Sequence, residues 1–185
     1  MLDNEEIRFM RYFIFVVFIL VLIVVSRIAM TDSFIVTSNS FNEGTMMKNI
    51  YACPENRQFH LLWKGFPDNI KSFAIIMEDP DAVPVAGFTW VHWSVFGISS
   101  SITSIEEGQN NIAGSTTVMN HFNEKNYLGP CPPPDQVHTY VICVYALSEE
   151  LDNSIARKPI TRATFENQYD STILAKAEIT SQYKR

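Results

Sequence analysis

Five side chains that can bind or orient an anion occur in two short segments of the sequence. The first segment carries Asp79 and Asp81 on either side of a proline, and His92 follows eleven residues after Asp81. The second segment carries His138 and Tyr140, which are two residues apart. Imidazole and phenol groups donate hydrogen bonds to anions, and a carboxylate can hold a histidine in one tautomer. If these side chains meet, they form a pocket for a small anion.

The segments around these residues have the composition of β-strands. Runs rich in β-branched and aromatic residues, bounded by Pro, Gly, Asn and Asp, predict strands at 34–36, 59–63, 72–77, 89–98 and 139–147. Alternate residues of a strand share a face, so His138 and Tyr140 point the same way. Both rows of side chains in 139–147 are largely apolar, which predicts that this strand is covered on both faces. Carboxylates, imidazoles and a phenol can therefore converge at one end of a sheet.

One helix is predicted near the C-terminus, over about residues 163–177. Phe165, Tyr169 and Ile173 recur at every fourth position, which gives an apolar stripe along one helix face. Together with the strands, this pattern predicts an all-β sandwich with a late helix.

Each of the two segments that carry these side chains also has an ordinary structural interpretation. Asp-Pro-Asp is common at strand ends, where Asp side chains bond to nearby backbone N–H groups. A histidine in a strand is more often a core residue than a ligand. The four prolines within residues 130–134 fix a stiff loop with few backbone donors. The functional interpretation therefore depends on the combination of segments, with the proline loop as a rigid wall.

In this combination the sequence resembles the phosphatidylethanolamine-binding protein family, and within it the bacterial Raf-kinase-inhibitor-like branch. The family carries D-P-D-A-P, then H-W, then Y-x-G-P-C-P-P, and finally H-R-Y. Here the matching segments are D-P-D-A-V at 79–83, H-W at 92–93, Y-L-G-P-C-P-P at 127–133 and H-T-Y at 138–140. The resemblance covers about residues 34–185.

The resemblance implies a mainly β fold, a Greek-key antiparallel β-sandwich with short C-terminal helices. It also implies a non-enzymatic pocket for phosphate-like anions, such as phospholipid headgroups or phosphorylated side chains. Carried over by position, its ligand-binding residues are Asp79, Asp81, His92, Gly129, Pro132, His138 and Tyr140. The loop 129–133 forms the wall, and Asp81 braces it. We expect no cofactor, and no metal because the His and Cys residues lack close ligand spacings.

One departure from the family concerns the charge of the pocket. Thr139 replaces the family's Arg in H-R-Y, which removes a permanent cation near the ligand. Binding is then expected to depend on His92, His138, the Tyr140 hydroxyl and backbone donors. Because an imidazole gains a proton as the pH falls, anions should bind more tightly at about pH 5.5 than at pH 8.

Two other function classes compete with the binding module. The first is an inhibitor or modulator of a protease or kinase, which would use the loops around the same pocket. The second is an enzyme, in which Cys131 and His138 would act as a nucleophile and its base. The family match explains Cys131 without catalysis, so we expect no enzymatic activity.

The three cysteines are Cys53, Cys131 and Cys143. An odd number does not make a disulfide framework, and at most one bridge can form. Cys143 lies in an alternating strand and is interpreted as a small buried apolar residue. Cys53 and Cys131 both fall at family cysteine positions and are the one pair suspected, but we expect no essential disulfide.

The N-terminus differs in kind from the rest of the chain. Residues 12–25 are an uninterrupted apolar run preceded by Arg8 and Arg11. The run is short for a membrane span, so it predicts either a signal peptide or an uncleaved hydrophobic anchor helix. A buried core helix is the weaker alternative, and Met10 is an alternative start. The expected divisions are 1–26 for signal or anchor, 27–33 for a linker and 34–185 for the domain, which should fold alone from about Arg27.

The composition sets the expected location and partners of this domain. The signal or anchor places it outside the cytoplasm, as a periplasmic, secreted or membrane-anchored protein. A net charge of −6 and a pI near 5.2 argue against non-specific binding to nucleic acid or to anionic membrane surfaces. The expected partners are a small anion or phospholipid headgroup, a protein target, and the membrane only through an uncleaved N-terminal segment.

Overall fold

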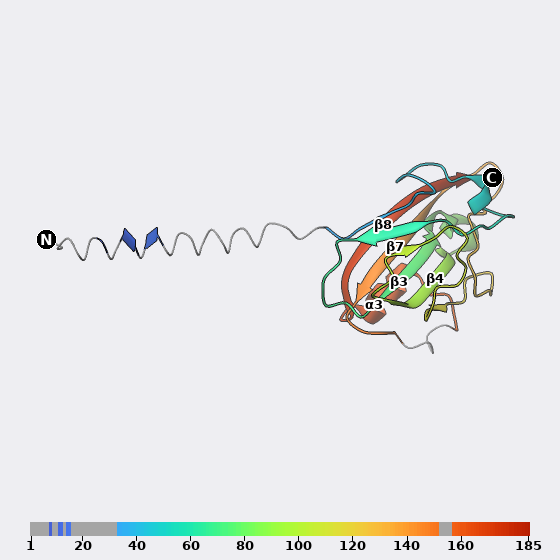
Figure 1. Cartoon of the computed structure of the whole chain (residues 1–185). Helices are drawn as coiled ribbons and strands as arrows, with labels where there is room; N and C mark the ends of the chain where they lie inside the picture. Colours follow the sequence, from blue (N-terminus) through green and yellow to red (C-terminus); the bar gives the residue numbers. More distant parts are fainter. Residues whose placement is uncertain (1–7, 9–10, 13, 16–32, 152–156) are drawn as a thin grey trace. The chain divides into compact units, whose positions relative to one another are not determined.

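The computed structural model describes residues 8, 11, 12, 14, 15, 33–151 and 157–185. Within the chain, Ser33–Arg185 forms one compact unit (Figure 1). Nearly all of the hydrophobic segment and linker predicted at 1–33 lies outside the described residues, and so does the helix expected there. No helix in the described part of the chain is long and apolar enough to cross a membrane.

The fold is mainly β and is built from two antiparallel sheets. The larger sheet has the order β6-β4-β3-β7-β8, with strands Thr116–Thr117, Trp90–Ser99, Ser72–Asp79, Val137–Leu147 and Ile173–Lys184. The smaller sheet has the order β1-β2-β5, with strands Ile35–Thr37, Leu61–Lys64 and Ser104–Ile105. The short helices are η1 (Asn49–Tyr51), η2 (Pro80–Ala82), α2 (Val83–Ala86) and α3 (Arg162–Tyr169). All five predicted strands are present, within a few residues of their expected bounds.

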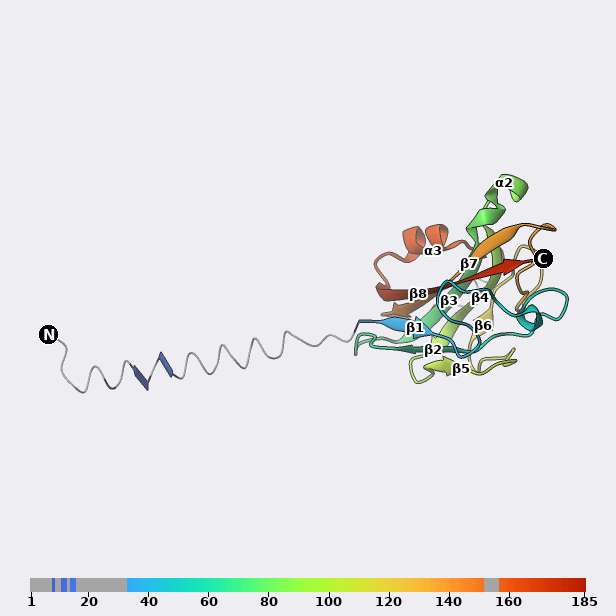
Figure 2. The same ribbon diagram turned by 90° about the horizontal axis from the view of Figure 1, so that it is seen from above.

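The larger sheet is covered on both faces, by the smaller sheet on one side and by α3 on the other (Figure 2). Strand β7 shows this directly. Tyr140, Ile142 and Val144 join the core that includes Trp63 of β2, whereas Cys143, Tyr145 and Leu147 pack in a second cluster with Phe165 of α3. The prediction that 139–147 is covered on both faces is confirmed. Burial on both sides fixes the register of the strand that carries His138.

The predicted helix over 163–177 is wrong in its second half. Helix α3 ends at Tyr169, and from Ile173 the chain runs as β8, paired with β7 from Val137 to Leu147. Phe165, Tyr169 and Ile173 do share one apolar cluster, as the stripe suggested, but Ile173 reaches it from a strand. The apolar spacing fits both structures, and the long ladder with β7 satisfies more backbone groups than two further helical turns would.

Helix α3 is attached to the larger sheet by an ion pair that gives a first testable prediction. The buried Glu78 carboxylate accepts from Arg162 Nε at 2.8 Å and from the Arg162 backbone N–H at 2.9 Å. Arg162 also contacts Glu178, whose side chain is 40% exposed. We expect Glu78→Gln to lower the free energy of unfolding by about 1.5–3 kcal/mol, as for hydrogen bonds to charged groups. The matched change Glu178→Gln should cost less than about 1 kcal/mol because water screens an exposed pair. Urea denaturation measures both, and equal losses would contradict this account.

Candidate functional site

The strand register brings the predicted site residues together at one end of the larger sheet. Asp79, the last residue of β3, pairs with Trp90 at the start of β4. Its neighbour Glu78 pairs with Val141 near the start of β7. His138 of β7 pairs with Tyr183 close to the end of β8. Because neighbouring antiparallel strands run in opposite directions, the ends of β3 and β8 meet the starts of β4 and β7.

Asp79 links the segment at the end of β3 to His138 at the start of β7. Its Oδ1 accepts from the Ala82 backbone N–H at 3.1 Å, which caps η2. Its Oδ2 lies 2.7 Å from Nδ1 of His138, and both side chains are buried. Nε2 of His138 lies 3.2 Å from Oε1 of Gln136. Both Asp79 oxygens therefore already hold a donor, and Asp79 fixes the His138 ring rather than offering a free acceptor.

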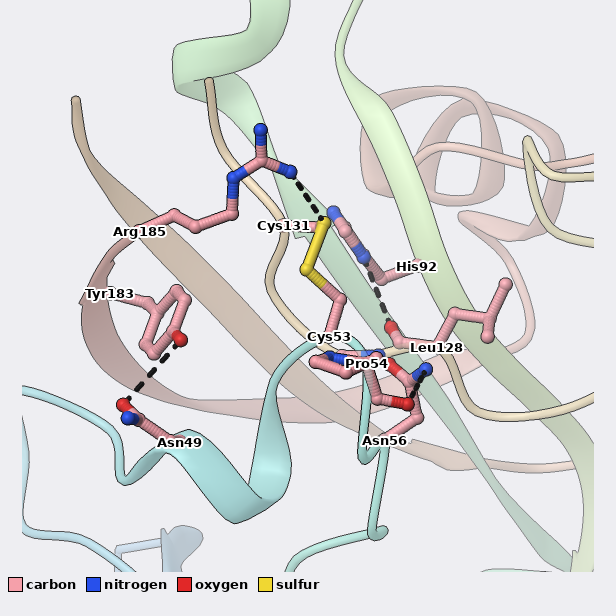
Figure 3. The surroundings of a disulfide bond; sticks show 10 residues. Asn49, Cys53, Pro54, Asn56, His92, Leu128, Cys131, Tyr183 and Arg185 are labelled. Atoms are coloured by element: carbon pink, nitrogen blue, oxygen red, sulfur yellow. Dashed lines mark hydrogen bonds between the residues drawn. A yellow bond between two sulfur atoms is a disulfide. The ribbon is translucent and has the colours of Figure 1, made fainter. Parts of the chain in front are cut away.

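His92 is held by the backbone of the loop that precedes the prolines. Its Nδ1 lies 3.0 Å from the Leu128 carbonyl oxygen, which can only accept, so Nδ1 carries the proton (Figure 3). Burial lowers the pKa of His92 to about 4, outweighing the Asp79 carboxylate and the Leu128 carbonyl, which act in the opposite direction. His92 is therefore neutral at pH 5.5 and above. The expectation that its protonation would tighten anion binding between pH 8 and pH 5.5 is wrong for this residue.

Tyr140 lies against His92 but does not line the cavity. The two ring centroids are 5.2 Å apart in an edge-to-face arrangement. Burial, followed by the nearby Asp79 carboxylate, raises the pKa of Tyr140, so the phenol keeps its proton. Its Oη is buried and has no hydrogen-bond partner among the described residues. Because Tyr140 does not line the cavity, this hydroxyl is not exposed to a ligand there.

Two of the predicted ligand-binding residues stabilise the segments around the cavity instead of lining it. Asp81 Oδ2 accepts from the Thr139 backbone N–H at 2.7 Å and so joins η2 to β7. Gly129 donates its N–H to Asn56 Oδ1 at 2.9 Å, and a Cβ at this position would lie 2.0 Å from the Tyr51 carbonyl oxygen. Neither residue lines the cavity. The brace expected of Asp81 exists, but it joins η2 to β7 rather than to the loop 129–133.

These groups surround a cavity of about 280 Å³. Four of the predicted residues line it, namely Asp79, His92, Pro132 and His138. Asp81, Gly129 and Tyr140 do not. The other lining residues are Ala82, Val85, Ala86, Trp90, Phe122, Cys131, Pro133 and Arg185. The cavity thus has a small polar floor and largely apolar walls, which is typical of a site for a small organic ligand.

Arg185 is a cavity residue that the sequence did not reveal. It follows β8 directly and lines the cavity, with its guanidinium Nη1 3.4 Å from Cys131 Sγ (Figure 3). Its backbone oxygen accepts from Asp135 N–H at 3.0 Å, which holds it beside the proline loop. Thr139 lies in the β7 row opposite to His138. Binding was expected to depend on His92, His138, the Tyr140 hydroxyl and backbone donors, and Arg185 adds a fixed cation from outside the motif.

Apolar side chains lie in the cavity lining and next to it. We call Val83, Val85, Phe88, Trp90 and Phe122 the apolar rim, of which Val85, Trp90 and Phe122 line the cavity. Val85 is 63% exposed, and Phe88 and Phe122 are each more than 40% exposed. Phe88 stacks on Trp90, and Phe122 packs edge-to-face against both Trp90 and His92. The rim was not predictable from the sequence, because the spacing of its members does not reveal that they gather at one cavity.

Cys131, which lines the cavity, belongs to a disulfide. Cys53 and Cys131, the suspected pair, are bonded to each other, and Cys143 is free and buried, as expected. The proposed Cys131–His138 dyad has no thiol to act as nucleophile. The backbone N–H of Cys53 also donates to Pro130 O at 3.0 Å. The proline loop is thus held to the segment around Cys53 by a covalent bond as well as a hydrogen bond.

Comparison with known proteins identifies this architecture. The family model described as phosphatidylethanolamine-binding protein matches residues 37–184. The chain belongs to the phosphatidylethanolamine-binding protein family. A UPF0098 protein of Aquifex aeolicus is 36% identical over 156 residues, which cover 81% of this chain and 88% of the relative.

Solved structures of the phosphatidylethanolamine-binding protein family have the same fold. Escherichia coli YbcL, described as a new member of the mammalian family, matches with a TM-score of 0.72 and 29% identity over 83% of this chain and 99% of its own. A carboxypeptidase Y inhibitor, solved in complex with its cognate proteinase, matches with a TM-score of 0.50 over 83% of each chain. At 19% identity, this second likeness concerns the fold alone.

Proposed function

We propose that this domain is a binding module whose cavity takes a small phosphate-like anion, free or as a phospholipid headgroup, without catalysing a reaction. The observation that carries the proposal is Arg185 at a cavity whose floor is polar and whose walls are apolar. A guanidinium presents several N–H donors in a plane and is the preferred protein group for phosphate.

A further donor supports an anionic ligand. Trp90 Nε1 is buried without a hydrogen-bond partner among the described residues, and Trp90 lines the cavity. It can donate to an oxyanion that approaches Arg185. The described residues that line the cavity include no hydroxyl group and no free thiol, so none of them pairs an ordinary nucleophile with His92 or His138. This composition favours binding over catalysis.

The second testable prediction concerns Arg185. Arg185→Gln should weaken binding of inorganic phosphate and of phosphoethanolamine by about 10- to 100-fold, equivalent to the about 1.5–3 kcal/mol of a charge-assisted hydrogen bond. Isothermal titration calorimetry measures this. Arg157→Gln is the matched control, because Arg157 is exposed and does not line the cavity. Tighter binding of phosphoethanolamine than of phosphate would favour the headgroup as source. If the unmodified protein bound neither compound, the proposed function would be wrong.

An inhibitor of a protease or kinase is the second candidate, and the apolar rim favours it. Val85 and Phe88 are exposed side chains of the kind that dock into a partner's pocket. The carboxypeptidase Y inhibitor shows that a protein of this fold can act on a proteinase. Assays against a panel of carboxypeptidases, other proteases and kinases separate the candidates: a pure binding module inhibits none of them.

We also propose that the domain works outside the cytoplasm, either released from its N-terminal segment or anchored by it. The Cys53–Cys131 disulfide supports this location, because structural disulfides persist mainly in oxidising compartments. Intact-mass analysis of the protein from native membrane and soluble fractions tests it and reveals whether residues 1–26 are removed.

A further inference from the structure

One acceptor in the cavity has no hydrogen-bond donor among the residues that the structure describes. Of the two ring nitrogens of His92, only Nδ1 makes a hydrogen bond within the described part of the chain, and that bond is to Leu128 O. The ring lines the cavity, and Figure 3 shows its second nitrogen on the side of the ring away from Leu128. Because Nδ1 carries the proton, Nε2 has a lone pair and accepts hydrogen bonds rather than donating them.

Resting on the proposed function, we infer that His92 makes this pocket select oxyanions that carry a proton, so that free phosphate or a phosphomonoester is preferred to the phosphodiester of a phospholipid headgroup. A phosphomonoester monoanion has one P–OH group, which can donate to Nε2 of His92 while its other oxygens accept from Arg185. A sulfate monoester has the same shape and the same single charge, but it has no O–H group. In the sulfate complex Nε2 and a ligand oxygen would face each other as two acceptors, which is repulsive.

The surroundings of His92 support this assignment. The charged or titratable groups that face it or share its cavity are Asp79, His121, His138, Tyr140 and Arg185. Asp79 already accepts from Ala82 N–H and is paired with His138, so it does not compete for the ligand's proton. Burial keeps the pKa of His92 at about 4, and the second pKa of a phosphomonoester is near 6. At pH 5 the imidazole is therefore neutral while the phosphomonoester still carries its proton.

The charge balance points the same way. The buried Asp79 carboxylate lines the same cavity as Arg185 and offsets its positive charge. A monoanion avoids part of the electrostatic cost that a second negative charge would meet beside Asp79 in a partly dehydrated site. The pocket should therefore prefer the protonated form of a phosphomonoester to its dianion.

Phenyl phosphate and phenyl sulfate form a matched pair for the test, since at pH 5 they differ by one O–H group. Calorimetry at pH 5 should show phenyl phosphate binding roughly 10- to 100-fold more tightly, the discrimination expected of one buried hydrogen bond in a charged site. At pH 8 phenyl phosphate has lost the proton, and the ratio should fall towards one or invert.

The outcomes separate this inference from the proposed function. A ratio near one at pH 5, or the same ratio at pH 5 and pH 8, overturns the selection by His92 and leaves anion binding intact. If neither compound binds, the proposed function fails as well. His92→Phe keeps an aromatic ring of similar size and should weaken phenyl phosphate alone. Because this variant also loses the bond to Leu128, nitrogen-15 NMR of the unmodified protein provides a second measurement. Nε2 should be unprotonated at pH 5, and a protonated Nε2 overturns the inference.

Discussion

Replacing both Cys53 and Cys131 with serine should lower the free energy of unfolding by about 4 kcal/mol, on the chain-entropy estimate for a long enclosed loop. The two cysteines are separated by 78 residues, so the bridge removes many conformations from the unfolded chain. A loss of this size is a large fraction of the stability of an ordinary domain. This expected result replaces the expectation from sequence that no disulfide is essential, because the structure shows which loop the bond closes.

Guanidinium chloride denaturation with and without dithiothreitol provides the measurement. The reductant should shift the midpoint of the unmodified protein to lower denaturant concentration and leave that of the double variant unchanged. Cys143→Ser is not a suitable control, since this residue is completely buried and a new hydroxyl would perturb the core. A double variant within about 1 kcal/mol of the unmodified protein would show that the chain-entropy account does not apply here.

The strands and the convergence of the site were predictable from local sequence. Period-two alternation in β7 identified its two buried faces, and this placed His138 and Tyr140 on the same side. Asp79 at the end of β3 meets His138 at the start of β7, because neighbouring antiparallel strands place those ends together. These features depend on short-range patterns and one general rule of sheet geometry, so a single sequence was sufficient.

Arg185 could not be placed because β8 was predicted as a helix up to residue 177. Only the ladder between β7 and β8 carries the chain back to the cavity, where Arg185 follows Lys184. The spacing of Phe165, Tyr169 and Ile173 fits a helix, and the choice between helix and strand depends on a partner strand that the local sequence does not specify. The cation at the cavity was therefore missed for a reason of topology rather than of chemistry.

The roles of Asp81, Gly129 and Tyr140 depend on packing that sequence alone does not reveal. Gly129 lies in the family motif beside residues that do line the cavity. Its importance comes from contact with Tyr51, which is distant in sequence. Asp81 likewise bonds to the backbone of Thr139 and not to a ligand. A motif thus identifies which residues belong to a site, whereas burial and hydrogen bonds determine which of them can touch a ligand.

The most severe single substitution should be Gly129→Ala. The added Cβ would lie 2.0 Å from the Tyr51 carbonyl oxygen and 2.8 Å from Ala52 Cα, so two backbone segments would have to separate. The same segments are joined by the Tyr127 hydroxyl, which donates to Tyr51 O at 2.6 Å, and by Gly129 N–H, which donates to Asn56. We expect Gly129→Ala to lower the free energy of unfolding by at least about 3 kcal/mol, the upper end of the usual cost of overpacking a core. Backbone atoms cannot move aside as a flexible side chain can.

Gly44→Ala is the matched control for this prediction. Gly44 has a φ of +68°, but a Cβ added there would meet no atom within 4 Å beyond its chain neighbours, so the change introduces backbone strain without a clash. We expect Gly44→Ala to lower the free energy of unfolding by about 1–2 kcal/mol, the cost of placing alanine rather than glycine in the left-handed conformation. Gly129→Ala should also weaken phosphate binding, since displacement of residues 127–131 moves the Leu128 carbonyl that fixes His92. Gly44→Ala should leave that affinity unchanged. Equal stability losses in the two variants, or unchanged phosphate affinity in Gly129→Ala, would show that the segment around Gly129 adapts without disturbing the cavity.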